Sequence, residues 1–168
     1  PVAPAVAAAP AAVAAPAPAP TQPPFSTPES NPLLAEWTTP FGLPPFGEVK
    51  EDHYLPAFKV AMAEERREIA AITGDPAQAT FENTIAALDQ AGDRLAKVGA
   101  VFFALQGADT NDRLQAINRE VSPLLSAHRD DTSLDPALFR RVQAVWDARA
   151  SLKLDPDQQM LLERTWKG

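Results

Sequence analysis

The sequence lacks cysteine and contains very little histidine. None of its 168 residues is cysteine, and only His53 and His128 are histidines. Disulfides, thiolate metal sites and a cysteine nucleophile are therefore excluded from the segment. A His-x-x-x-His zinc helix needs two histidines four residues apart, so that both rings reach one metal. His53 and His128 lie far apart in the sequence, so they cannot form such a pair.

Positive charge and long apolar runs are also scarce. The chain has 15 basic and 22 acidic side chains, which give a formal net charge of -7. A nucleic-acid partner is not expected, because its binder must neutralise phosphates. No uninterrupted apolar run is as long as the roughly 18 residues that a membrane span requires, so we expect no such span. Strand alternation and Asn-Gly hairpin signals are missing too, which argues against a sheet.

Proline is concentrated in residues 1–30, which read PVAPAVAAAPAAVAAPAPAPTQPP and onward. Its rings fix φ and remove amide donors, so a continuous helix cannot form and a disordered linker is predicted. A complete secretory signal is absent, but an Ala/Pro spacer often follows a signal that has been removed. We therefore expect the periplasm, with the cytoplasm as the alternative. Because the last helix stops without a cap, the sequence is expected to be cut at both ends.

From Asn31 onward the apolar residues recur with helical periodicity, which predicts an all-α fold. An extended arm is expected over residues 31–51. About five helices follow: one capped by Glu51 or Asp52 and ended by Gly74, one continuous over Phe81 to Phe102, one over Thr110 to His128, one from Asp135 and Pro136 through Trp146, and a truncated one from Asp155 and Pro156.

Three residues inside these helices carry specific expectations. Gly92 and Gly99 lie on the apolar seam of the second helix, where they predict close approach of another helix backbone. Pro123 lies inside the third helix and should kink or break it, because its ring clashes with the carbonyl four residues back.

Candidate chemical groups are few, and each has a structural explanation. His53 is expected to cap a helix or to be partly buried, and His128 to complement the dipole of a helix end. The charged run over residues 64–68 should be a solvated face. Asp130 and Asp131 point apart, which argues against paired acid-base work. The glycines Gly42, Gly47, Gly92 and Gly99 lack the strand-turn-helix context of a phosphate loop.

The aromatic residues are expected to have structural roles. Trp37, Trp146 and Trp166 are interpreted as core anchors, given the acidic charge. In the arm, Trp37, Phe41 and Phe46 are expected to bury their rings against neighbouring helices, while the nearby prolines lower the entropy lost on docking. No catalytic, cofactor-binding or metal-binding residue is predicted in this segment.

Several stretches resemble the amino-terminal portion of bacterial peptidyl-dipeptidases, in the thimet oligopeptidase family of zinc metallopeptidases. They are NPLL…W…PFGLPPFGEVKEDHYLPAF, AEERREIAAI, ATFENTIAALDQAGDRLAKVGAVFFAL, NDRLQAINREVSPLLSAHRDD, LFRRVQAVW and SLKLDPDQQMLLERT, with TFENTI at residues 80–85 the most diagnostic. The resemblance covers residues 31–168. The leader has no counterpart in it.

The resemblance implies a mostly helical, two-lobed enzyme with a deep channel, of which this segment forms part of the wall. The zinc-binding HExxH helix would lie beyond residue 168, so no catalytic residue is carried over and the segment alone should be inactive. The implied activity is release of carboxy-terminal dipeptides from oligopeptides by a zinc-dependent monomer, with the remainder of its own chain as the segment's partner. The alternatives are an endo-acting oligopeptidase of the same family and, from another class, a non-catalytic helical adaptor.

Overall fold

The computed structural model describes residues 31–168, so the linker predicted over residues 1–30 lies outside the described residues. Within this range the chain forms helices and turns but no strand, which confirms the all-α class. None of the helices there is long and apolar enough to span a membrane. The elements in order are the 3-10 turns η2 (Pro40–Gly42) and η3 (Glu51–His53), α1 (Tyr54–Gly74), the π-helical η4 (Phe81–Ala86), α2 (Ala87–Gln90), α3 (Asp93–Ala108), α4 (Asp112–Ser133), α5 (Pro136–Ala148), the 3-10 turn η5 (Arg149–Ser151) and α6 (Pro156–Lys167).

Two helices begin at the caps predicted from the sequence. The Asp135 carboxylate accepts hydrogen bonds from the backbone N–H groups of Ala137 at 2.7 Å and Leu138 at 3.2 Å. Asp155 accepts from the backbone N–H of Gln158 at 2.8 Å. In both helices proline takes one of the first positions, where its missing donor would have had no partner.

The start of α1 differs from the prediction, because neither Glu51 nor Asp52 caps it. No side chain of the described residues caps α1, but the backbone N–H of Lys50 donates to Nδ1 of His53 at 3.1 Å, so this half-buried histidine caps the preceding turn η3, in line with the predicted capping role. Asp52 pairs with Arg113 at the start of α4. The hydrogen bond and charge of this guanidinium hold the pKa of Asp52 below its usual value.

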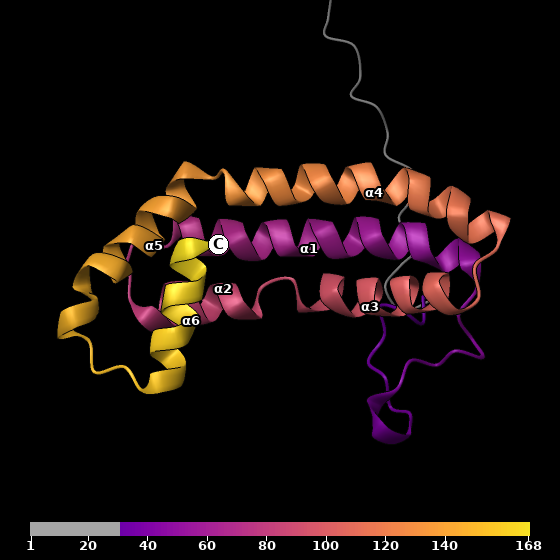
Figure 1. The fold of residues 1–168 in the computed structure, drawn as a ribbon, viewed down its shortest axis with the longest axis horizontal. Helices are drawn as coiled ribbons and strands as arrows, with labels where there is room; N and C mark the ends of the chain where they lie inside the picture. Colours follow the sequence, from indigo (N-terminus) through magenta and orange to yellow (C-terminus); the bar gives the residue numbers. More distant parts are fainter. Residues whose placement is uncertain (1–30) are drawn as a thin grey trace, which may run out of the picture.

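Helix α1 lies in the middle of the molecule, with α4 along one side of it and α3 along the other (Figure 1). Both flanking helices pack against α1 but make little contact with each other. At one end, α5 continues from α4, and α6 crosses to pack on α5 and η4 (Figure 1). The three central helices therefore form a layer held together by α1.

The buried residues form two hydrophobic cores, and α1 contributes to both. Phe58 and Met62 belong to the first core, whereas Ile69 and Ile72 belong to the second. The first also holds Leu33, Leu34, Tyr54, Ala57, Val98, Val101, Phe102, Leu114, Ile117 and Val121, and the second also holds Phe81, Ile85, Leu138, Val142, Val145 and Leu162. Residues 63–68 of α1 thus separate the two cores.

Aromatic contacts organise the first core. The Phe102 ring is fully buried and meets Tyr54 and Phe58 edge-to-face, with ring centroids 5.1 Å and 5.4 Å away. Such pairs add about 0.5–1.5 kcal/mol each to the effect of burial. The Tyr54 hydroxyl is buried and finds no hydrogen-bond partner within residues 31–168. Its burial, with a smaller effect from the Glu51 charge, raises the pKa of Tyr54.

The predicted tryptophan anchors are confirmed. Trp37 packs against the first core, and its indole N–H donates to the Pro32 carbonyl at 3.0 Å. Trp146 and Trp166 pack against the second core and stack on each other, with centroids 5.4 Å apart and planes 7° from parallel. Phe139 stacks on the same Trp166 ring with centroids 5.8 Å apart. This stack joins α5 to α6 near the end of the chain.

The continuous second helix predicted over residues 81–102 is wrong. The chain leaves the helix at Ala91, passes through Gly92 with φ 78°, and resumes at Asp93. The apolar spacing does not reveal this break. The same spacing continues across it, although the apolar residues of η4 pack in the second core and those of α3 pack in the first. The expected backbone approach at the glycines is wrong too: a Cβ on Gly99 would meet only the Phe103 side chain at 3.9 Å, and one on Gly92 would meet the Glu65 carboxyl group at 2.7 Å.

Two further expectations are met only in part. Helix α4 runs without a break through Pro123 and on to Ser133, so a break there is wrong, while a kink stays a prediction. Both Pro123 and Arg119 are exposed, so water can reach the carbonyl that loses its amide partner. In the arm, Phe41 is 99% exposed and Phe46 is 52% exposed, so only the Trp37 ring packs as expected. The arm turns at η2 and projects from the helices (Figure 1), which carries both phenylalanine rings away from the core.

Candidate functional site

A belt of polar contacts crosses the molecule between the two cores. Three acidic side chains of α1 make it, each with a different partner: Glu64 with Nη1 of Arg94 at 3.1 Å, Glu65 with Nε2 of His128 at 2.8 Å, and Glu68 with the backbone N–H of Gly92 at 2.9 Å. We call these six residues the polar belt. It ties α1 to α3, to α4 and to the break between α2 and α3.

The polar belt corrects the prediction that residues 64–68 form a solvated face. Arg66, Arg67 and Glu68 are exposed as expected, but the side chains of Glu64 and Glu65 are only 28% and 19% exposed. The partner of Glu65, His128, is 4% exposed, whereas the partner of Glu64, Arg94, is 40% exposed. The run is therefore divided between one solvated side of α1 and one that faces α3 and α4.

His128 is also placed differently from the prediction. It lies five residues before the end of α4, so it does not complement the dipole of a helix end. Its side chain is 4% exposed and bonded to Glu65, while Nδ1 is buried without a partner among the described residues. The spacing of Val121, Leu125 and His128 puts the imidazole on the apolar face of α4. That spacing was the signal in the sequence that could have located it.

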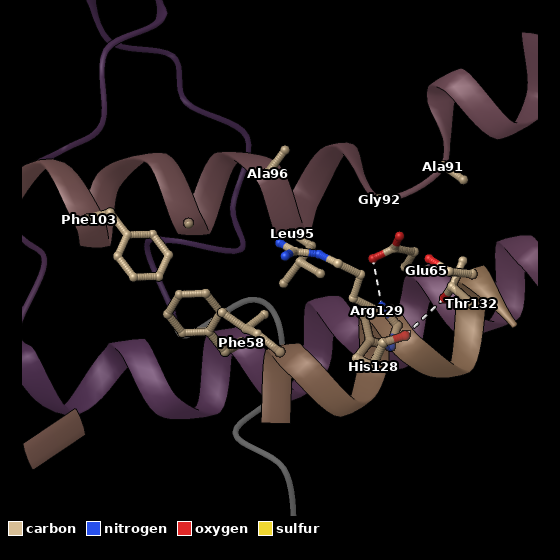
Figure 2. Close-up of a pocket in the computed structure, with 13 residues that line it drawn as sticks. Phe58, Glu65, Ala91, Gly92, Leu95, Ala96, Phe103, His128, Arg129 and Thr132 are labelled. Atoms are coloured by element: carbon tan, nitrogen blue, oxygen red, sulfur yellow. Dashed lines mark hydrogen bonds and ion pairs between the residues drawn. The ribbon is translucent and has the colours of Figure 1, made fainter. Parts of the chain in front are cut away.

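A groove of about 390 Å³ opens between α3 and α4 above α1 (Figure 2). At one end it is apolar: the rings of Phe58 and Phe103 face each other there, with centroids 6.4 Å apart. The Glu65–His128 pair lies toward the other end, where Ala91 and Thr132 also line the groove (Figure 2). Along the α3 side the lining is made of small residues, Ala91, Gly92, Ala96 and Gly99, with Leu95 between them.

Three of the polar residues that line the groove are connected by hydrogen bonds. Glu65 bonds to His128, and the Thr132 hydroxyl donates to the His128 carbonyl at 3.1 Å. Nothing in this arrangement pairs a nucleophile with a base. Residues 31–168 hold no group of three or more His, Cys, Asp or Glu side chains suited to a metal ion. Asp130 and Asp131 are exposed at the surface, away from any such cluster.

The TFENTI stretch forms a second network of hydrogen bonds, at the start of η4. Thr80 and Asn83 cap each other: Asn83 N–H donates to the Thr80 hydroxyl at 3.1 Å, and Thr80 N–H donates to the Asn83 amide oxygen at 2.7 Å. The Asn83 amide also donates to the Asp75 carboxylate at 3.1 Å and to the Gln78 carbonyl at 3.0 Å. These bonds close the loop between α1 and η4.

Arg141 of α5 completes this network, and sequence reasoning missed it. Its Nη1 donates to the carbonyls of Asp75 at 2.9 Å and Ala77 at 3.1 Å, and Nε donates to the buried Thr84 hydroxyl at 3.3 Å. The side chain is only 11% exposed. Arg141 lies three residues after Leu138 and four before Val145, so it occupies the apolar face of α5. A charge on that face was the overlooked signal.

Two curated bacterial proteins match most of this chain. It is 44% identical over 133 residues to the dipeptidyl carboxypeptidase of Escherichia coli K12, and 43% identical over 134 residues to that of Salmonella typhimurium LT2. The segment is homologous to bacterial dipeptidyl carboxypeptidases. These matches cover 79% and 80% of the chain, which confirms the resemblance stated from the sequence.

The dipeptidyl carboxypeptidases are much longer than this chain, which spans 20% of the length of each. More distant similarity extends to oligopeptidase A: 30% identity over 99 residues in Salmonella typhimurium and 25% over 134 residues in Escherichia coli. These matches cover 59% and 80% of the chain but only 14% and 19% of the relatives. No family model matches the chain.

The polar belt makes one position particularly sensitive. We expect Gly92→Ala to lower the free energy of unfolding by about 2 kcal/mol, because alanine is strained at positive φ and its Cβ would displace Glu65. Urea titration followed by circular dichroism measures this loss. Gly107→Ala is the control: Gly107 lies in α3 with nothing within 4 Å of an added Cβ, so it should be neutral or stabilising. Equal effects at the two glycines would contradict the role of Gly92.

Proposed function

We propose that this chain is a helical wall segment of a longer zinc-dependent peptidyl-dipeptidase, which releases dipeptides from the carboxyl end of oligopeptides. The observation that carries the proposal is the 43–44% identity to two dipeptidyl carboxypeptidases over about four fifths of the chain. A match of this length and identity supports a shared structural role. The chain spans only 20% of the length of those relatives, which supports placing the reaction in a part of the enzyme outside this chain.

The geometry supports a wall rather than a reaction centre. A helical layer, two cores and the polar belt hold α3 and α4 against α1 along its length. The residues present do not fit a zinc site, because they bring no three ligands together within residues 31–168. In this proposal, zinc is held by the part of the polypeptide outside this chain, and no step of the reaction is assigned to the residues described.

The proposed enzyme is a periplasmic monomer that acts on oligopeptides. The periplasmic location is supported by the Ala/Pro-rich residues 1–30, which resemble the spacer after an export signal. The cytoplasm is the alternative. Fractionation of cells that produce the complete polypeptide with a carboxy-terminal epitope decides between them: the tag should be released with the periplasmic contents.

The proposal is tested on the complete purified polypeptide with a blocked pentapeptide. We expect the last two residues to be released as a dipeptide, with the activity lost after chelation and restored by Zn²⁺. The same peptide with an amidated carboxyl end is the matched control, and it should be cleaved far more slowly. The 168-residue chain alone should leave both peptides intact. Mass spectrometry of the products identifies the bond that is cut.

The other candidate functions give different products. Internal cleavage of the amidated peptide would favour an endo-acting oligopeptidase, the alternative supported by the 30% identity to oligopeptidase A over 99 residues. Absence of cleavage, in a complete polypeptide whose sequence has no HExxH helix, would favour a helical adaptor and overturn the proposal.

A further inference from the structure

The groove between α3 and α4 is an unfilled space on the described part of the chain. Both helices rest on α1 but make little contact with each other, so a space of about 390 Å³ is left above α1. On the groove side of α3, Ala96 and Gly99 keep the space open, and a Cβ on Gly99 would meet nothing closer than the Phe103 ring at 3.9 Å.

The lining of the groove indicates the chemistry of its occupant. Phe58, Leu95 and Phe103 (Figure 2), together with Leu125, form the apolar part of its lining. Among its polar residues, Glu65 and His128 are bonded to each other, and Arg129, Thr132 and Ser133 line the same end of the groove. Phe103 remains 45% exposed at this surface. An occupant with an apolar face toward the phenylalanine and leucine side chains and a polar face toward Arg129 fits this lining.

The dimensions of the groove limit the occupant further. From Leu95 to Phe103 its wall extends by about 12 Å at the rise of an α-helix, a little over two turns. Amphipathic helices bind in grooves of this kind through apolar side chains three and four residues apart. The small residues of α3 would allow such a helix to approach closely.

We propose that this groove seats about two turns of an amphipathic helix that belongs to the rest of the longer polypeptide. The inference rests on the proposed function, because the chain spans only 20% of the length of the dipeptidyl carboxypeptidases it matches. Most of the surface that the segment would meet therefore lies outside it. The groove is then a contact between the wall and the remainder of the enzyme.

The test fills the groove in the complete polypeptide by Gly99→Leu. Gly107→Leu is the matched control, since it makes the same change in the same helix where an added Cβ has open space around it. In the complete polypeptide, Gly99→Leu should lower Tm by at least about 3 °C, and Gly107→Leu should not. In the 168-residue chain, both variants should keep or raise Tm, because leucine favours a helix more than glycine does.

Three results would overturn the inference. An unchanged or raised Tm for Gly99→Leu in the complete polypeptide would mean that no helix fills the groove. A raised KM for peptide substrates with unchanged Tm would assign the groove to substrate. A dimer of the 168-residue chain that Gly99→Leu dissociates would assign it to a second copy. Because Tm is measured without substrate, failure of the proposed activity would be seen separately from failure of this inference.

Discussion

Replacing Phe102 with alanine is expected to lower the free energy of unfolding of the chain by about 3–5 kcal/mol. The ring is fully buried and contacts Tyr54 and Phe58 edge-to-face, so its removal leaves a cavity in the first core and ends both aromatic contacts. It also lies on α3, which is held against α1 through this core. Urea titration measures this loss of stability, with unfolding followed by circular dichroism at about 222 nm, where α-helices give a strong signal.

The neighbouring Phe103 provides the control for this prediction. It has the same side chain on the same helix but is 45% exposed, at the groove between α3 and α4. Phe103→Ala should therefore cost about 1 kcal/mol or less, since less apolar area returns to water. A loss at Phe103 as large as that at Phe102 would contradict the assignment of the core to one side of α3.

Local signals were sufficient to predict much of the fold. Asp135 and Asp155, each followed by proline, mark the starts of α5 and α6, because a cap acts within three residues of sequence. The apolar periodicity of α1 and α4 identifies both helices. These features depend on neighbours along the chain, so the sequence alone determines them.

The errors arise where distant residues decide the conformation. Gly92 has positive φ, and the Glu68 carboxylate, 24 residues earlier, accepts its N–H. No neighbour in the sequence indicates that bond, so the apolar spacing was read as one helix. The arm failed for a similar reason: proline and aromatic composition predicts docking but does not say where the chain turns. Phe41 lies in that turn with φ 64°.

The candidate site was less predictable than the fold, because it consists of contacts between helices. A run of charges on α1 reads as solvated unless the partners on α3 and α4 are known. His128 and Arg141 were both detectable in principle, as polar side chains on apolar helix faces. Their partners were not, since Glu65 lies 63 residues from His128 and Thr84 lies 57 residues from Arg141.

Arg141→Met is expected to lower the free energy of unfolding by about 3 kcal/mol. Methionine keeps much of the side-chain volume, so the change mainly removes the hydrogen bonds to the Asp75 and Ala77 carbonyls and to the Thr84 hydroxyl. Those groups would lose their charged donor at a side chain that is only 11% exposed. Urea titration gives the size of the loss.

Arg140→Met is the control that distinguishes loss of this hydrogen-bond network from a general effect of removing a positive charge. Arg140 precedes Arg141 on α5 and is exposed, so its replacement should change the free energy of unfolding by less than about 0.5 kcal/mol. If Arg141→Met is as mild as Arg140→Met, α5 is held by the second core alone, through Leu138, Val142 and Val145. If only Arg141→Met is severe, the TFENTI stretch is a structural clamp.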